Sequence, residues 1–201
     1  MNEKKISISA GNSKMGAIPS VSLPAWTTCP KNAPCFRECY AAKISRLRPS
    51  VRTAYERNLE ILQSDPDLYF AQVEMQARLS SFFRWHVSGD IPNEKYFSEM
   101  VRIARAVPGC RFLCFTKKAE IVNAFIDGGG EIPGNLKVIF SVWKEWRKPN
   151  PHNLPECAVI FPDDDLPTGW KVCGGNCTEC ACRGVGCWEI QNGETIAIYK
   201  H

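Results

Sequence analysis

The stretch Val138-Ile139-Phe140-Ser141-Val142 decides the fold class that the sequence predicts. It is a nearly unbroken apolar run, as expected for a strand that is buried on both faces. Apolar runs at residues 111–115 and 158–161 lie on either side of it in the chain. Buried strands of this kind are typical of parallel sheets that helices cover.

Apolar residues at helical spacing occupy the segments before and between these runs. The predicted helices are residues 50–63, a segment starting at Asp65-Pro66, a segment from Asn93, and residues 121–126. Short strands are also expected at 83–87 and 195–199. Strands that alternate with helices imply right-handed βαβ units. We therefore expect an α/β protein, either a doubly wound sheet or a partial (β/α) barrel of about six mostly parallel strands.

In both architectures, functional residues lie at the carboxyl ends of the strands. The residues that fall there are Ser88, Gly89, Asp90, Thr116, Lys117 and Ser141. Asp163-Asp164-Asp165 follows another strand, and we interpret it as a solvated turn. These strand ends are where a ligand is expected.

Composition restricts the class of protein. The 201 residues carry a net charge of +4, which does not by itself indicate nucleic acid. Residues 31–57 hold seven basic side chains, which either form a solvated helix face or attract an anion. Residues 1–10 lack the apolar core of a signal peptide, and no apolar run is long enough to span a membrane. We expect a soluble, cytoplasmic protein.

Cysteine is the outlier, with eleven residues. In a reducing cytosol, clustered cysteines bind metal or do redox chemistry more often than they form disulfides. Cys29, Cys35 and Cys39 lie on one proline-rich loop without a nearby histidine. Three thiolates are one ligand short of a closed site, so a [4Fe–4S] cluster held by them would leave one iron open to a small molecule. The alternative is a zinc site that a distant cysteine completes.

A second cluster places five cysteines within residues 173–187. Cys177 and Cys180 have the two-ligand spacing, and Cys173 and Cys187 complete a set of four, with Cys182 as the spare or alternate ligand. Glycines between them suit a tight loop around a metal. Zinc and an auxiliary [4Fe–4S] cluster are both compatible with this set, and we favour iron–sulfur.

Three segments resemble the phage gene product 88 family. They are residues 12–25 (Asn-Ser-Lys-Met-Gly-Ala-Ile-Pro-Ser-Val-Ser-Leu-Pro-Ala), the loop from Thr28-Cys29-Pro30 to Cys39-Tyr40-Ala41, and the cysteine-rich residues 173–188. This family looks like a compact relative of the radical S-adenosylmethionine enzymes. The spacing Cys-x5-Cys-x3-Cys differs from the Cys-x3-Cys-x2-Cys that is usual in that superfamily.

The resemblance implies a partial barrel over residues 1–166, with a cysteine-rich metal-binding extension, residues 167–201, packed on it. S-adenosylmethionine would chelate the open iron, and its one-electron cleavage would yield a 5′-deoxyadenosyl radical. Ser88-Gly89-Asp90 resembles the element that receives the methionine amino group, and Tyr40 takes the aromatic position beside a cluster cysteine. An electron donor such as flavodoxin or ferredoxin would be a partner, besides an unknown substrate.

Two rival functions remain open at this point. One is a non-catalytic iron–sulfur or zinc protein that binds nucleic acid or a host partner through its basic stretch. The other is an iron–sulfur enzyme whose open iron acts without a radical. We interpret Cys110, Cys114, Cys157 and His86 as core residues.

Overall fold

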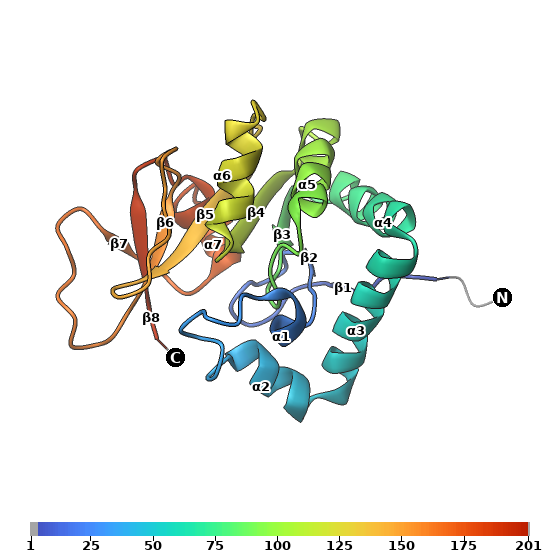
Figure 1. The fold of residues 1–201 in the computed structure, drawn as a ribbon, viewed down its shortest axis with the longest axis horizontal. Helices are drawn as coiled ribbons and strands as arrows, with labels where there is room; N and C mark the ends of the chain where they lie inside the picture. Colours follow the sequence, from blue (N-terminus) through green and yellow to red (C-terminus); the bar gives the residue numbers. More distant parts are fainter. Residues whose placement is uncertain (1–3, 201) are drawn as a thin grey trace.

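The fold is one mixed, mostly parallel sheet flanked by helices, in a computed structural model that describes residues 4–200 (Figure 1). Its strands, in spatial order, are β1 (Ile8–Ser9), β2 (Ser20–Val21), β3 (Phe82–Trp85), β4 (Arg111–Thr116), β5 (Leu136–Trp143), β6 (Glu156–Ile160), β8 (Thr195–Tyr199) and β7 (Lys171–Val172). Only the β1–β2 pair is antiparallel. Residues 1–3, the first part of the segment judged to lack a signal peptide, lie outside the described residues.

The helices are α1 (Ala25–Thr28), α2 (Tyr40–Leu47), α3 (Pro49–Ser64), α4 (Pro66–Arg78), α5 (Glu94–Ala106), α6 (Ala119–Asp127) and α7 (Cys177–Cys182), with a 3-10 turn, η1 (Gly186–Trp188). Asp65 and Asn93 cap α4 and α5, because their side chains accept hydrogen bonds from the amides of Leu68 and Tyr96. None of the described helices is long and apolar enough to cross a membrane.

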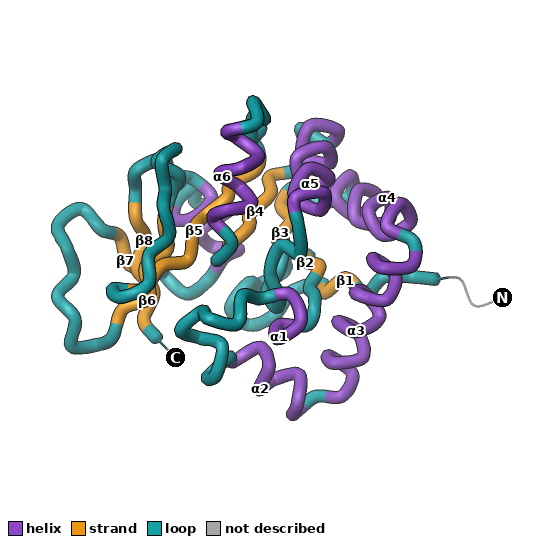
Figure 2. The backbone as a smooth tube through the Cα atoms, in the orientation of Figure 1, coloured by secondary structure: helices purple, strands orange, loops and turns teal. Residues whose placement is uncertain are grey.

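Different elements pack on the two faces of the sheet (Figure 2). On one face, Phe112, Val138 and Phe140 pack in the main core with residues of α4, α5 and α6. On the other, Leu113 and Ile139 pack with Trp188 of the cysteine-rich region. Side chains alternate along a strand, so every central strand supplies both cores. This explains why 138–142 is apolar almost throughout.

The α/β class and the longer elements agree with the sequence predictions. The apolar runs coincide with β4, β5, β6 and β8, and the predicted helix 50–63 lies within α3. The predicted number of about six strands is too low, because β1, β2 and β7 have only two residues each and leave no periodic pattern. The sheet has edges at β1 and β7, so it does not close into a barrel. The described part of the cysteine-rich extension adds β7 and β8 to this sheet.

Candidate metal centres

The first cysteine region is a loop between two short helices. Cys29 ends α1, Cys39 precedes the first residue of α2, and Cys35 lies between them. All three thiols are partly buried. Cys29 and Cys39 pack with Ala25, Ala41 and Ala42 in a small apolar cluster separate from both main cores. Small side chains around the sulfurs leave the loop close to the surface.

A buried carboxylate organises the strand ends below this loop. Asp90 is fully buried and accepts hydrogen bonds from Thr116 Oγ1 at 2.6 Å, the Ile91 amide at 2.9 Å and the Lys117 amide at 3.0 Å. Lys117 Nζ lies 3.7 Å from Asp90 Oδ2. These contacts join the loop after β3 to the end of β4. A cofactor amino group could reach Asp90 only by replacing one of these donors.

The strand ends are also attached to α1. The Asp90 amide donates to Thr28 Oγ1 at 3.0 Å, one residue before Cys29. Gly89 has a φ of +82°, and a Cβ there would lie 2.7 Å from both Leu23 O and Thr28 Oγ1. Glycine is therefore required by both conformation and space. The predicted Ser88-Gly89-Asp90 element thus positions the residue next to the first cysteine.

Electrostatics link the same groups. Burial raises the pKa of Cys29 to about 12, against a lowering effect of Lys117. Burial lowers the pKa of Lys117, but Asp90, Cys29 and Cys35 raise it by more, so its net pKa is raised. Lys117 is therefore a persistent cation beside the thiols. Tyr40 joins the loop to the sheet, since its hydroxyl donates to Val87 O at 2.9 Å.

Ser141 lies in a different setting from the other predicted strand-end residues. It pairs in register with Cys157 of β6 and shares the parity of Ile139, whose side chain packs against the cysteine-rich region. The structure therefore brings Ser88, Gly89, Asp90, Thr116 and Lys117 to the first cysteine loop, and places Ser141 on the sheet face of the second cysteine region.

A buried polar chain beside the strand ends includes His86, which the sequence analysis interpreted as a core residue. His86 has a φ of 54°, and its Nε2 lies 3.0 Å from the Tyr96 hydroxyl, which lies 2.9 Å from the Tyr69 hydroxyl. Burial lowers the pKa of His86 to about 4, so the ring is neutral at pH 7. The prediction of a hydrogen-bonded core histidine is confirmed.

The second cysteine region is built around α7 and η1. Cys173, Cys177, Cys180 and Cys187 pack together with Trp188 in the second core, whereas Cys182 is exposed and outside it. The Trp188 indole Nε1 donates to Cys177 O at 3.1 Å. Gly186, with a φ of +68°, brings the backbone so close that a Cβ would lie 3.2 Å from Cys180 Sγ. The four predicted ligands therefore gather at one place.

The N-terminal turn of residues 12–17 covers α7. The Cys177 amide donates to Lys14 O at 3.0 Å, and Thr178 Oγ1 donates to Met15 O at 2.7 Å. A Cβ on Gly16 would lie 2.2 Å from Thr178 Oγ1. Two segments that carry the family resemblance, about 160 residues apart, are thus packed on each other.

Sequence reasoning missed two residues of this second region. Cys157 is buried as predicted, but it lies in the same cluster as the four thiols. Arg84 Nη1 lies 3.7 Å from Cys177 Sγ and donates to it. A detectable signal was present for Arg84, because a charge in the apolar run Phe82-Phe83-Arg84-Trp85 must face something polar.

The donor atoms suit a thiophilic metal, although no group of three or more Cys, His, Asp or Glu side chains within residues 4–200 stands in a geometry that could hold a metal ion. Thiolate sulfur is the ligand of zinc and of iron–sulfur clusters. The cysteine sets therefore fit such groups by the chemistry of their donor atoms, and ligation would require the sulfurs to move toward one another.

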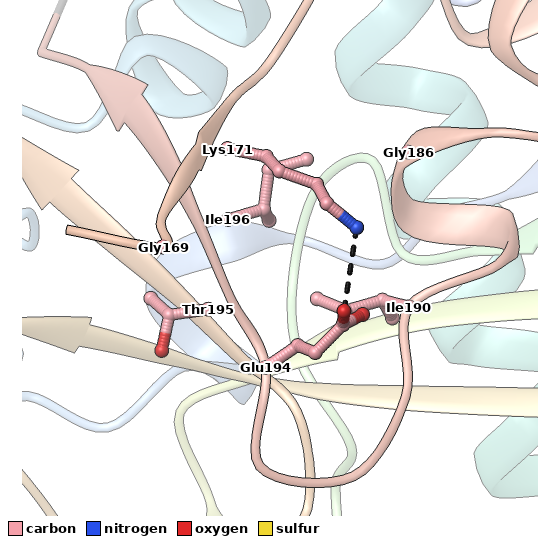
Figure 3. Close-up of a pocket in the computed structure, with 7 residues that line it drawn as sticks. All are labelled: Gly169, Lys171, Gly186, Ile190, Glu194, Thr195 and Ile196. Atoms are coloured by element: carbon pink, nitrogen blue, oxygen red, sulfur yellow. Dashed lines mark hydrogen bonds and ion pairs between the residues drawn. The ribbon is translucent and has the colours of Figure 1, made fainter.

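Cavities lie away from the first cysteine loop. A cleft of about 10 Å³ is lined by Gly186 and Ile190, among others, and Lys171 Nζ lies 3.3 Å from Glu194 Oε1 there. Figure 3 shows these side chains and their ion pair. The cleft has room for one water at most. A polar cavity of about 270 Å³ is lined by Asn150, Glu156 and Glu194, among others. None of the predicted site residues lines either cavity, so the chemistry of the cysteine regions defines the candidate sites.

Comparisons with known proteins identify similarity to one protein family. The family model described as "Gene product 88" matches residues 1–195. A "Gene 88 protein" of Mycobacterium phage L5 is 28% identical over 122 residues, which cover 53% of this chain and 51% of the relative. A "Gene 88 protein" of Mycobacterium phage D29 is 26% identical over 146 residues, 65% of this chain and 59% of the relative. The chain thus spans between half and two thirds of each relative's length. No solved structure matches.

Proposed function

The chain belongs to the gene product 88 family, and we propose that it is a cytoplasmic iron–sulfur enzyme of phage origin related to the radical S-adenosylmethionine enzymes. Cys29, Cys35 and Cys39 would hold a [4Fe–4S] cluster with one open iron. The single observation that carries this proposal is the placement of exactly three thiols on a loop fastened to the carboxyl ends of parallel strands.

The surroundings of the loop support a bound cofactor with charged groups. S-adenosylmethionine bound at the open iron would supply radical chemistry, because one electron would break its S–C5′ bond to give methionine and a 5′-deoxyadenosyl radical. Lys117 is a partly buried cation that can attract the carboxylate of S-adenosylmethionine, and Asp90 is the nearby anion for its amino group. Tyr40 keeps the loop on the sheet through Val87 O. An electron donor such as flavodoxin or ferredoxin would supply the electron.

A partial barrel is the finer fold that we propose. Its support is a contact between segments that follow strands near opposite edges of the sheet: Lys200, after β8, forms a 2.7 Å ion pair with Glu38 of the first cysteine loop, which comes after β2. The sheet must curve to bring these segments together. The face that carries Arg84, Phe115 and Ser141 would then line the inside.

For the second region we propose an auxiliary [4Fe–4S] cluster on Cys173, Cys177, Cys180 and Cys187. Its support is the shared packing of these four thiols in one core and the separation of Cys182 from them. Zinc is the competing occupant, because four cysteine thiolates also suit tetrahedral zinc. Metal and sulfide analysis after anaerobic purification distinguishes the two.

The radical function is tested by reducing anaerobic, iron-loaded protein with dithionite in the presence of S-adenosylmethionine. We expect release of 5′-deoxyadenosine, and loss of release in Cys35→Ser. Cys182→Ser, which changes the exposed spare cysteine, is the matched control and keeps the activity. A fully loaded first cluster that releases no 5′-deoxyadenosine would refute the radical function.

A second candidate function is favoured by the exposed face of α2. Tyr40, Ile44 and Leu47 are exposed there at helical spacing, and Arg46 lies over the Trp26 ring at 5.3 Å. Basic side chains and exposed aromatic rings together suit single-stranded nucleic acid. A non-catalytic protein of this kind would bind an oligonucleotide with an affinity that falls steeply with salt, and Arg46→Gln would weaken it.

A further inference from the structure

Arg84 is a partly buried cation without a carboxylate partner within residues 4–200. It projects from β3 to the face of the cysteine-rich region, and its guanidinium carbon lies 4.8 Å from the centre of the Phe115 ring. Its Nε is buried and has no hydrogen-bond partner, and within residues 4–200 no acidic side chain forms an ion pair with it. Its one hydrogen-bond acceptor is Cys177 Sγ, at 3.7 Å from Nη1.

The buried, unpartnered Nε of Arg84 favours a neighbouring anion. Burying a charge costs free energy unless another charge or hydrogen bonds compensate for it. Cys177 accepts a hydrogen bond from Arg84 directly, and Cys157 and Cys187 of the same region lie within electrostatic range. Cys114 and the Tyr40 hydroxyl also lie within that range, but neither belongs to the second cysteine region. Thiolates bound to a metal would provide the missing negative charge, and their sulfur atoms would provide acceptors.

We infer that Arg84 is the counter-cation of the second cysteine site, and that it donates hydrogen bonds to sulfur there from Nη1 and from the otherwise unpartnered Nε. The inference rests on the proposed auxiliary [4Fe–4S] cluster. Reduction adds one negative charge to such a cluster, so a nearby cation and N–H···S bonds stabilise the reduced form. Arg84 therefore makes this cluster easier to reduce, as a positioning residue that acts through the ligand sulfurs.

Three variants separate charge from hydrogen bonding. Arg84→Lys keeps the charge but loses the planar fork, Arg84→Gln keeps a donor but loses the charge, and Arg84→Met keeps only the apolar stem on Phe115. Arg105→Gln is the matched control, because Arg105 lies on α5, away from the cysteines, and donates to Glu131 O. Each change is made in the full chain with Cys29, Cys35 and Cys39 replaced by serine. Only the second cluster then contributes to the measured signal.

The readout is the midpoint potential from a redox titration followed by electron paramagnetic resonance. We expect Arg84→Gln to disfavour reduction by about tenfold, which is ~59 mV for a one-electron couple. Arg84→Lys should change it less, Arg84→Met more, and Arg105→Gln not at all. An unchanged potential in iron-loaded Arg84→Gln and Arg84→Met would overturn the inference while leaving the cluster itself in place.

If the second cysteine site holds zinc instead of iron, both the auxiliary cluster and the effect of Arg84 on its reduction are refuted. The counter-cation role then has its own measurement, the rate of zinc release to a chelator. Faster release from Arg84→Gln than from Arg105→Gln would support that role, and equal rates would overturn it. Circular dichroism establishes that each variant is folded, and a near-normal Arg84→Lys shows that a Gln or Met effect comes from the lost charge.

Discussion

The two cysteine regions differ in what holds them. The first has three thiols, two of which pack on a small cluster of alanines, and its support is a polar network at the ends of β3 and β4. The second has four thiols packed with Trp188 in an apolar core that covers one sheet face. A loosely covered loop suits a site that a small molecule must enter, and a packed one suits a closed site. The following predictions test this contrast, from the largest effect to the smallest.

The largest effect is expected when one thiol is removed from each region. Cys187→Ser should lose the metal of the second region and lower the free energy of unfolding by at least ~3 kcal/mol, because metal ligation and folding are coupled there. Cys35→Ser should lose the first cluster and change stability by less than ~1 kcal/mol. Metal analysis measures the metal content of each variant, and urea unfolding measures its free energy of unfolding. Equal losses of stability would contradict the contrast.

Asp90→Asn tests the polar support of the first region. The variant leaves Lys117 without its counter-ion and turns an acceptor into a partial donor facing Thr116 Oγ1. Removing one partner of a buried pair costs about 3–5 kcal/mol. Thermal unfolding should show this loss of stability, and metal analysis should show a loss of iron from the first cluster. Asp163→Asn, in an exposed turn, is the control and should stay within ~0.5 kcal/mol.

Acid should weaken the same strand ends through His86. Its folded pKa of about 4 lies below the ordinary 6.5, so the neutral ring is favoured by folding. This stability is fully present above pH 6.5 and is lost as the pH falls from 6.5 to 4, by about 3 kcal/mol in total. The groups facing the ring are Tyr96, Asp90, Lys117 and Lys118. The loss of stability between pH 7 and pH 4 should be smaller in His86→Gln, and an unchanged pH dependence would argue against this role.

Gly16→Ala should disturb only the second region. The new Cβ would clash with Thr178 Oγ1, and residue 16 has a φ of +65°, which alanine rarely adopts. The clash and the strained backbone together should cost about 1–3 kcal/mol of stability. The expected result is a lower unfolding midpoint and faster metal loss from the second site, with the first cluster unaffected. Gly109→Ala, where a Cβ meets nothing within 4 Å, should leave both unchanged.

The sequence predicts those parts of the fold that depend on local pattern. β4, β5, β6 and β8 were recognisable because each is an apolar run that both cores bury. The two-residue strands β1, β2 and β7 were not, because their pairing comes from tertiary contacts. The residues at the ends of β3 and β4 lie together because the carboxyl ends of parallel strands meet at one edge.

The rest of the candidate sites depends on register and docking, which one sequence does not reveal. Ser141 faces Cys157 because of the pairing between β5 and β6. Cys157 was correctly expected to be buried, yet its position beside the second set of thiols follows from how α7 sits on the sheet. Arg84 became significant only once its neighbour, Cys177, was known.

The contact between residues 12–17 and α7 has a consequence for biosynthesis. A ribosome makes this turn about 160 residues before it makes Cys177 and Thr178. The proposed cluster of the first cysteine loop could therefore form while these later residues are still unmade, whereas the second site must wait until residues 173–187 have emerged. A nascent chain stalled before residue 173 would expose Leu113 and Ile139 on an uncovered sheet face, which makes unfinished chains prone to aggregation.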